Sequence, residues 1–143
     1  MDIVIDANVL VAELLRDRGR ALLKSNEIDL FAAEKVVEET RHELVKRVKK
    51  MQEANRFSEA VGEQLLKLAT EIIDIYISLV PLSDYSSLEA EAKKRIPRDL
   101  DDWHTIAVSL TLEAAIWTED KDFFGCGCPV WTTETLLIQL EDI

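Results

Sequence analysis

The chain has 143 residues, of which 48% are hydrophobic, so it is long enough to bury the core of one domain and too apolar to stay disordered. It carries 17 basic and 28 acidic residues, which gives a formal net charge of −11. That balance argues against tight, nonspecific binding of nucleic acid, because such binding needs Lys and Arg to neutralise phosphates. Nucleic acid stays open as a substrate, and the acidity also suits a basic protein partner.

The patterns of apolar and charged residues bear on cellular location and organisation. No apolar run is long enough to cross a bilayer, and no basic segment precedes an apolar one near the first residue. We therefore expect a cytoplasmic protein without membrane association, folded as a single domain over residues 1–143. Cys126 and Cys128 are expected to be reduced, packed thiols, because no second Cys or His pair lies nearby in the sequence to complete a zinc site.

The first short stretch of the chain predicts a central strand that ends in an acid. Ile3, Val4 and Ile5 form a β-branched run, which is typical of a strand buried on both faces. Asp6 ends the run, and residues 7–15 predict a helix. The Asp6 carboxylate is thereby expected at the carboxyl end of a central strand, where open α/β sheets bind their ligands.

Strands and helices are predicted to alternate along the rest of the chain. A break at residues 16–19 precedes a short helix that contains Leu22 and Leu23. The elements expected after it are a strand at 29–32, a helix at 34–51, a helix at 56–77, a strand at 77–80, a helix from 83 to 94 or 95, a helix at 101–112, strands at 114–117 and 130–132, and a last helix capped by Thr133. This order predicts an α/β fold, with a parallel sheet covered by helices on both faces.

The two long helices carry apolar residues at three- and four-residue steps. In the first, the stripe consists of Val37, Thr40, Leu44, Val48 and Met51, and in the second of Phe57, Val61, Leu65, Leu68, Ile72 and Tyr76. The polar side of the first helix carries Glu39, Lys46 and Lys50. That side is interpreted either as a solvated surface or as a track that guides a phosphate chain.

Acidic residues follow two of the predicted strands. Asp6 ends the first strand and Asp120 follows the fourth, so the two carboxylates face one crevice if these strands are neighbours. Helix capping is the alternative for each. Asp102 lies in the first turn of its helix and borders the core. The fourth acid is either Glu38 or Glu39, and the apolar stripe of the helix favours Glu38.

Four segments resemble the PIN domain family, and its VapC-like ribonucleases in particular. They are Val-Ile-Asp-Ala-Asn-Val-Leu from residue 4, Val-Val-Glu-Glu from residue 36, Asp-Leu-Asp-Asp-Trp from residue 99, and Trp-Thr-Glu-Asp-Lys-Asp-Phe from residue 117. They occur in the family's order and span nearly the whole chain. The resemblance implies an α/β/α sandwich around a five-stranded parallel sheet of order 3-2-1-4-5.

The resemblance also implies an activity and the residues for it. It implies an endoribonuclease that depends on Mg²⁺ or Mn²⁺, as the toxin of a toxin–antitoxin pair, with RNA as substrate and with an antitoxin and a second copy of the chain as partners. The family's catalytic, metal-binding acids fall on Asp6, Glu39, Asp102 and Asp120, so the motif favours Glu39 over Glu38. Its supporting polar positions fall on Asn8 and Thr118. The rival hypothesis is a catalytically silent PIN-like module that binds a protein partner.

Overall fold

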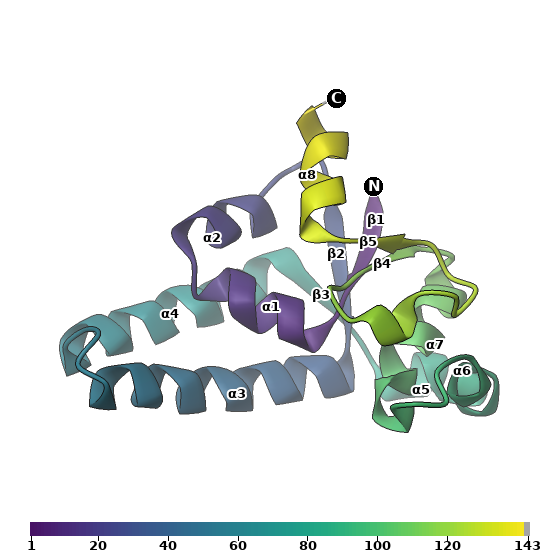
Figure 1. The fold of residues 1–143 in the computed structure, drawn as a ribbon, viewed down its shortest axis with the longest axis horizontal. Helices are drawn as coiled ribbons and strands as arrows, with labels where there is room; N and C mark the ends of the chain where they lie inside the picture. The colour runs from purple at the N-terminus through teal and green to yellow at the C-terminus, as the bar shows by residue number, and fades with distance from the viewer. Residues whose placement is uncertain (142–143) are drawn as a thin grey trace.

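Five parallel strands form the centre of the molecule in the order β3-β2-β1-β4-β5 (Figure 1). The structure is a computed structural model that describes residues 1–141. The strands are β1 (Asp2–Ile5), β2 (Asp29–Ala33), β3 (Ile77–Val80), β4 (Ala115–Trp117) and β5 (Val130–Trp131). The predicted strand order is confirmed, and it places β1 and β4 side by side.

Helices cover both faces of this sheet, as predicted. One side carries α1 (Ala7–Leu14), α2 (Asp17–Leu23), α3 (Glu34–Glu53) and α4 (Glu59–Tyr76), and the other carries α5 (Leu82–Tyr85), α6 (Glu89–Arg95) and α7 (Trp103–Leu112) (Figure 1). The helix α8 (Thr133–Glu141) follows β5. Short 3₁₀ turns complete the fold: η1 (Ser86–Leu88), η2 (Leu100–Asp102) and η3 (Lys121–Phe123).

The β-branched run in β1 lies at the middle of the core. Ile3, Val4 and Ile5 are fully buried, because β2 and β4 flank them in the sheet and helices cover both faces. Hydrophobic burial of this kind is the main favourable term in folding. The strand ends where Asp6 takes an extended conformation and caps α1.

Several predicted boundaries differ from the structure. Residues 17–19, expected in a break, form the first turn of α2. The single helix expected from residue 83 to 95 is three short pieces, α5, η1 and α6, and the fully buried Tyr85 lies at the first junction between them. The helix expected from Asp101 begins as the 3₁₀ turn η2 and becomes α-helical at Trp103.

Two helix caps also differ from the prediction. The helix α4 begins at Glu59 rather than Arg56, because the Ser58 hydroxyl accepts a hydrogen bond from the Val61 N–H. At α8 the Thr132 hydroxyl accepts a hydrogen bond from the Thr135 N–H, which is the capping role expected of Thr133. The Thr133 hydroxyl instead accepts a hydrogen bond from the Trp117 indole.

The apolar face of α4 is the largest error of the sequence analysis. Of the six residues expected to be buried together, only Ile72 is buried, and Val61 is 52% exposed. The buried residues include the small Gly62 and Ala69, because α4 packs closely against α3 there. The stripe expected on α3 is confirmed from Val37 to Val48.

The cysteines and the apolar character of the helices can be compared with the sequence analysis. Cys126 and Cys128 are free thiols, the first buried and the second half-buried. Within residues 1–141, no helix combines the length and apolar character that crossing a membrane requires.

A glycine in α2 sets how closely α2 approaches α1, and this gives a testable prediction. A Cβ atom at Gly19 would collide with the backbone of Glu13, which cannot move without shifting α1. We expect Gly19→Ala to lower the free energy of unfolding by about 1–3 kcal/mol through overpacking, although alanine favours helix by about 1 kcal/mol. Urea denaturation measures the change.

Gly62→Ala is the matched control for this prediction. The atoms nearest to a Cβ at Gly62 belong to the flexible side chain of Gln52, which can move aside. Gly62→Ala is therefore expected to cost less than Gly19→Ala. Equal effects of the two substitutions would contradict the proposed role of Gly19.

Candidate active site

The Asp6 carboxylate is held in place at the carboxyl end of β1. It is 4% exposed, and one oxygen accepts a hydrogen bond of 2.8 Å from the Ala7 N–H. The other oxygen accepts a hydrogen bond of 2.9 Å from the Thr118 hydroxyl, which is fully buried just after β4. Asp6 therefore caps α1, as the alternative interpretation held, and it is also fixed to the neighbouring strand.

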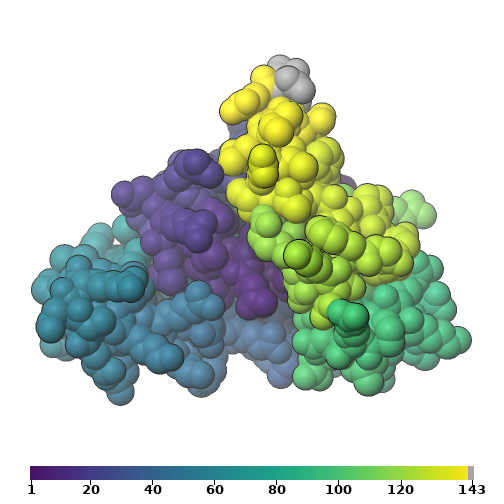
Figure 2. All heavy atoms as spheres, viewed as in Figure 1, coloured from purple at the N-terminus to yellow at the C-terminus, as the bar shows by residue number. Residues whose placement is uncertain are grey.

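The same threonine connects Asp6 with the segment that carries Asp120. The Thr118 Oγ1 atom accepts a hydrogen bond of 3.0 Å from the Asp120 N–H. One Asp120 oxygen accepts a hydrogen bond of 2.9 Å from the Asp122 N–H and caps η3. In Figure 2 the start of the chain (purple) meets residues near 120 (yellow-green) and the start of α3 (blue). The segments of Asp6, Asp120 and Glu39 thus converge on one face.

The pKa of Asp102 is affected by the other acids. Asp102 is half-buried where η2 joins α7. Burial raises its pKa to about 7, and the charges of Asp6, Asp99, Asp120 and Glu39 add to the rise. Ionisation of Asp102 is therefore opposed first by the loss of solvent and then by its acidic neighbours.

The electrostatics distinguish Glu39 from Glu38. The charges of Asp120 and Glu39 are among the causes that raise the pKa of Asp6, after burial, while its hydrogen bonds lower it. Glu38 is not among those causes; it acts on Glu39 and Tyr85. The helical wheel favoured Glu38 because it considers only the buried stripe, whereas α1 also packs against α3 and brings its first residues toward Glu39.

The donor set fits a divalent cation in its chemistry. None of the four acids forms an ion pair with a Lys or Arg among residues 1–141. Their mutual repulsion is the condition that a cation would relieve. Within the same residues, no three or more His, Cys, Asp or Glu side chains are already arranged around a common point that could hold a metal ion.

The structure also places residues to which the sequence analysis gave a smaller role or none. Asn8 is exposed in the first turn of α1 and lines a hollow together with Glu39. Asp99 caps η2, since its side chain accepts a hydrogen bond from the Asp101 N–H, and its charge also raises the pKa of Asp102. Lys35 was missed: its charge opposes the rise in the pKa of Glu39. The four-residue spacing of Lys35 and Glu39 on one helix was the available signal.

His104 is a structural residue of α7. Its Nδ1 atom lies 2.8 Å from the Tyr85 hydroxyl, and its ring stacks on Trp103 with 3.9 Å between ring centroids. Burial lowers the pKa of His104, so the imidazole is neutral near pH 7. The imidazole thereby holds the buried Tyr85 against α7.

The parallel sheet of order 3-2-1-4-5, with carboxylates at its carboxyl edge, defines an α/β domain of the kind that nucleases use. The family profile described as the PIN domain matches residues 4–141, and the chain belongs to this family of nucleases. No curated protein sequence is similar enough to count as a match.

Solved structures with the same fold support this assignment at the level of architecture. PAE2754 from Pyrobaculum aerophilum has a TM-score of 0.66 at 17% identity, over 100% of this chain and 91% of that one. VapBC2 from Rickettsia felis, bound to a DNA fragment from its promoter, has a TM-score of 0.64 at 12% identity, over 92% and 98%. A toxin–antitoxin complex from Klebsiella pneumoniae has a TM-score of 0.58 at 16% identity, over 91% and 96%.

Removing the Thr118 hydroxyl is expected to destabilise the fold. Thr118→Val keeps the shape of the side chain but leaves an Asp6 oxygen and the Asp120 N–H without their partner. The cost is expected to be about 1–3 kcal/mol, as for other buried polar groups left unsatisfied. Urea denaturation measures it, and Thr118→Ser, which retains the hydroxyl, should recover most of the loss. A stability of Thr118→Val equal to that of wild type would contradict this role.

Removing the Asp102 charge is expected to have the opposite effect. Between about pH 4 and pH 7 the folded protein keeps a proton on Asp102 that the unfolded chain releases, so rising pH destabilises the wild type across this window. In metal-free buffer, Asp102→Asn should raise Tm by a few degrees at pH 8, since about 1 kcal/mol corresponds to roughly 2–8 °C.

The same measurement at low pH is the control for Asp102→Asn. Below pH 4 the carboxyl is protonated in both states, so the gain in Tm should disappear. A gain of equal size at pH 8 and below pH 4 would show that packing, rather than charge, distinguishes the variant.

Proposed function

We propose that the protein is an endoribonuclease that depends on Mg²⁺ or Mn²⁺ and hydrolyses phosphodiester bonds of RNA. The observation that carries this proposal is the link through Thr118, whose hydroxyl donates a hydrogen bond to Asp6 and accepts one from the Asp120 N–H. Burial raises the pKa of Asp102 to about 7, and the charges of Asp6, Asp120 and Glu39 add to that rise. Asp6, Glu39, Asp102 and Asp120 would hold the cation.

Each part of the site has its own task in this proposal. A divalent cation supplies a lowered pKa for the attacking water and neutralises charge that develops on the leaving oxygen. The Thr118 hydroxyl positions Asp6 by donating a hydrogen bond to its carboxylate, and it positions Asp120 by accepting a hydrogen bond from the Asp120 N–H. Such supporting contacts fix the direction of a ligand oxygen. Asn8, exposed beside Glu39, would bind the RNA or a water at the site.

We further propose that the chain acts in the cytoplasm, as a single domain and as the toxin of a toxin–antitoxin pair. The solved structures with the same fold support this, since the one from Klebsiella pneumoniae is a toxin–antitoxin complex. The net charge of −11 suits a basic segment in the antitoxin. A homodimer is the expected assembly.

A second candidate function is a catalytically silent module that binds a protein partner. The charge of −11 favours it, and so does the lack, within residues 1–141, of side chains already gathered around a metal position. Both functions predict partner binding, so cleavage separates them. A Tm that rises with Mn²⁺ without any cleavage of RNA would favour the silent module.

Asp6→Asn is the decisive substitution for nuclease activity. Substitution of a residue that only supports a metal ligand costs roughly 10–100-fold in activity. With Mn²⁺, the rate at which Asp6→Asn cleaves single-stranded RNA should fall by more than that, because Asp6 is proposed as a ligand itself. Wild type should also be inactive in EDTA. Gel analysis of labelled RNA measures both effects.

Asp84→Asn is the matched control, because Asp84 is an exposed carboxylate in α5. It should cleave like wild type. Retained cleavage by Asp6→Asn, or cleavage by wild type in EDTA, would contradict the proposed function.

A further inference from the structure

A groove between α1 and the far end of α3 concentrates positive charge in this acidic protein. It has a volume of about 840 Å³. Five of its lining residues are cations, namely Arg16, Lys46, Arg47, Lys50 and Arg56, and only one, Glu43, is acidic. A groove lined by one sign of charge attracts the opposite sign, even where the net charge of the protein is unfavourable.

The basic groove continues into the candidate active site. A second hollow of about 350 Å³ is lined by Asn8, Glu39 and His42, and it shares Glu43 and Arg47 with the groove. Both hollows follow one side of α3, because their residues recur at three- and four-residue steps. The polar side of α3 therefore leads from an acid of the site to a row of cations.

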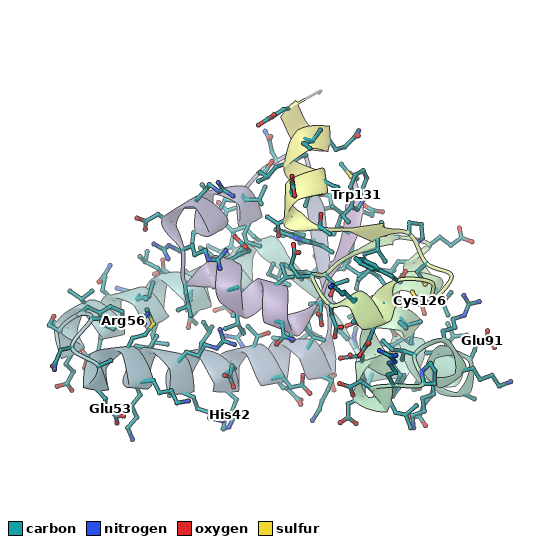
Figure 3. The ribbon with its side chains drawn as sticks, in the orientation of Figure 1. His42, Glu53, Arg56, Glu91, Cys126 and Trp131 are labelled. Atoms are coloured by element: carbon teal, nitrogen blue, oxygen red, sulfur yellow. The ribbon has the colours of Figure 1, made fainter. Side chains whose placement is uncertain are left out.

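Two of the cations have no competing partner. Glu43 pairs with Arg47 at 3.2 Å and with Lys46 at 4.0 Å, and Arg16 pairs with Glu13 at 3.5 Å. Within residues 1–141, Lys50 and Arg56 form no ion pair. Figure 3 shows Arg56 near the turn between α3 and α4. These two side chains are available to bind an anion from outside the chain.

The charge distribution decides what kind of anion fits. Four acids and a net charge of −11 repel a polyanion such as RNA, so capture requires cations close to the acids. The groove supplies them, and its floor is formed by small or aliphatic side chains such as Ala12, Leu15 and Met51. Among residues 1–141, none that lines the groove is aromatic, so it offers phosphate contacts rather than the stacking platforms that hold bases.

We propose that this groove binds the phosphate backbone of the RNA strand and leads the strand along α3 to the acids. The inference rests on the proposed nuclease function and names the path of its substrate. The eleven steps from Glu39 to Lys50 rise about 16 Å along the helix, at about 1.5 Å per residue. At about 3.4 Å per stacked nucleotide, that distance corresponds to about five nucleotides on one side of the cleaved bond.

Charge reversal in the groove tests the proposal through binding alone. The double variant Lys50→Glu with Arg56→Glu is compared with wild type for its affinity for a fluorescein-labelled oligouridylate, by fluorescence anisotropy in EDTA. We expect the affinity to fall about tenfold or more. Each phosphate contact on a single strand contributes about 0.7 to the slope of log Kd against log salt, so the loss of two contacts should lower that slope by about 1.4.

The control variant has the same change in net charge at other positions. Lys49 and Lys67 are exposed on α3 and α4, form no ion pair within residues 1–141, and line neither hollow. Lys49→Glu with Lys67→Glu should therefore bind the oligouridylate more tightly than the groove variant. Thermal melting of both variants confirms that each is folded.

The outcomes separate this inference from the function on which it rests. If the groove variant loses affinity and the control variant does not, the groove is supported as the binding site for RNA. This holds even if wild type with Mn²⁺ cleaves no RNA, and in that case only the nuclease proposal fails. Equal losses in groove and control variants, or unchanged affinity in the groove variant, overturn the groove. Poly-L-glutamate is the second probe. If the groove variant loses affinity for poly-L-glutamate but not for the oligouridylate, the proposal is also overturned, because the groove would then bind an acidic protein segment.

Discussion

The hydrogen bond from Thr118 to Asp6 is the contact on which the arrangement of the site depends. It joins residues that are 112 positions apart in the chain, and it lies just beyond the point where β1 and β4 pair through Ile5 and Trp117. Parallel neighbours end at the same edge of a sheet, so this register brings an acid and a hydroxyl into contact. Because the carboxylate is buried, its charge is tolerated only with such partners.

The fold gathers acids at the carboxyl edge of the sheet and places cations farther along α3. At the edge, burial raises the pKa of Asp102, and the charges of the other acids raise it further. The energy for holding them there comes from the apolar core beneath, in which β1 is fully buried. Along α3 the acid Glu39 and the cation Lys50 share one side, so a chain with a charge of −11 still presents a basic groove beside its site.

The neighbours of a helix matter as much as its pattern of apolar residues. A helical wheel considers only the buried stripe, but α3 contacts the sheet, α4 and α1, and Glu39, outside that stripe, lines a hollow together with Asn8 of α1. On α4 the pattern of large apolar residues was misleading, because the helix approaches α3 through Gly62 and leaves Val61 exposed. On α3 the spacing of apolar residues predicted the buried side correctly, whereas on α4 the packing partner decided it.

The sequence by itself determined the alternation of strands and helices, the burial of the first strand, and the acids that follow the strands. Those features depend on local periodicity and on residues adjacent in the chain. Only the tertiary structure decided that Thr118 meets Asp6, that Asp99 acts on Asp102, and that the basic side of α3 closes against α1. Distance between residues remote in sequence sets hydrogen bonds and charge interactions, and that distance exists only once the elements have packed.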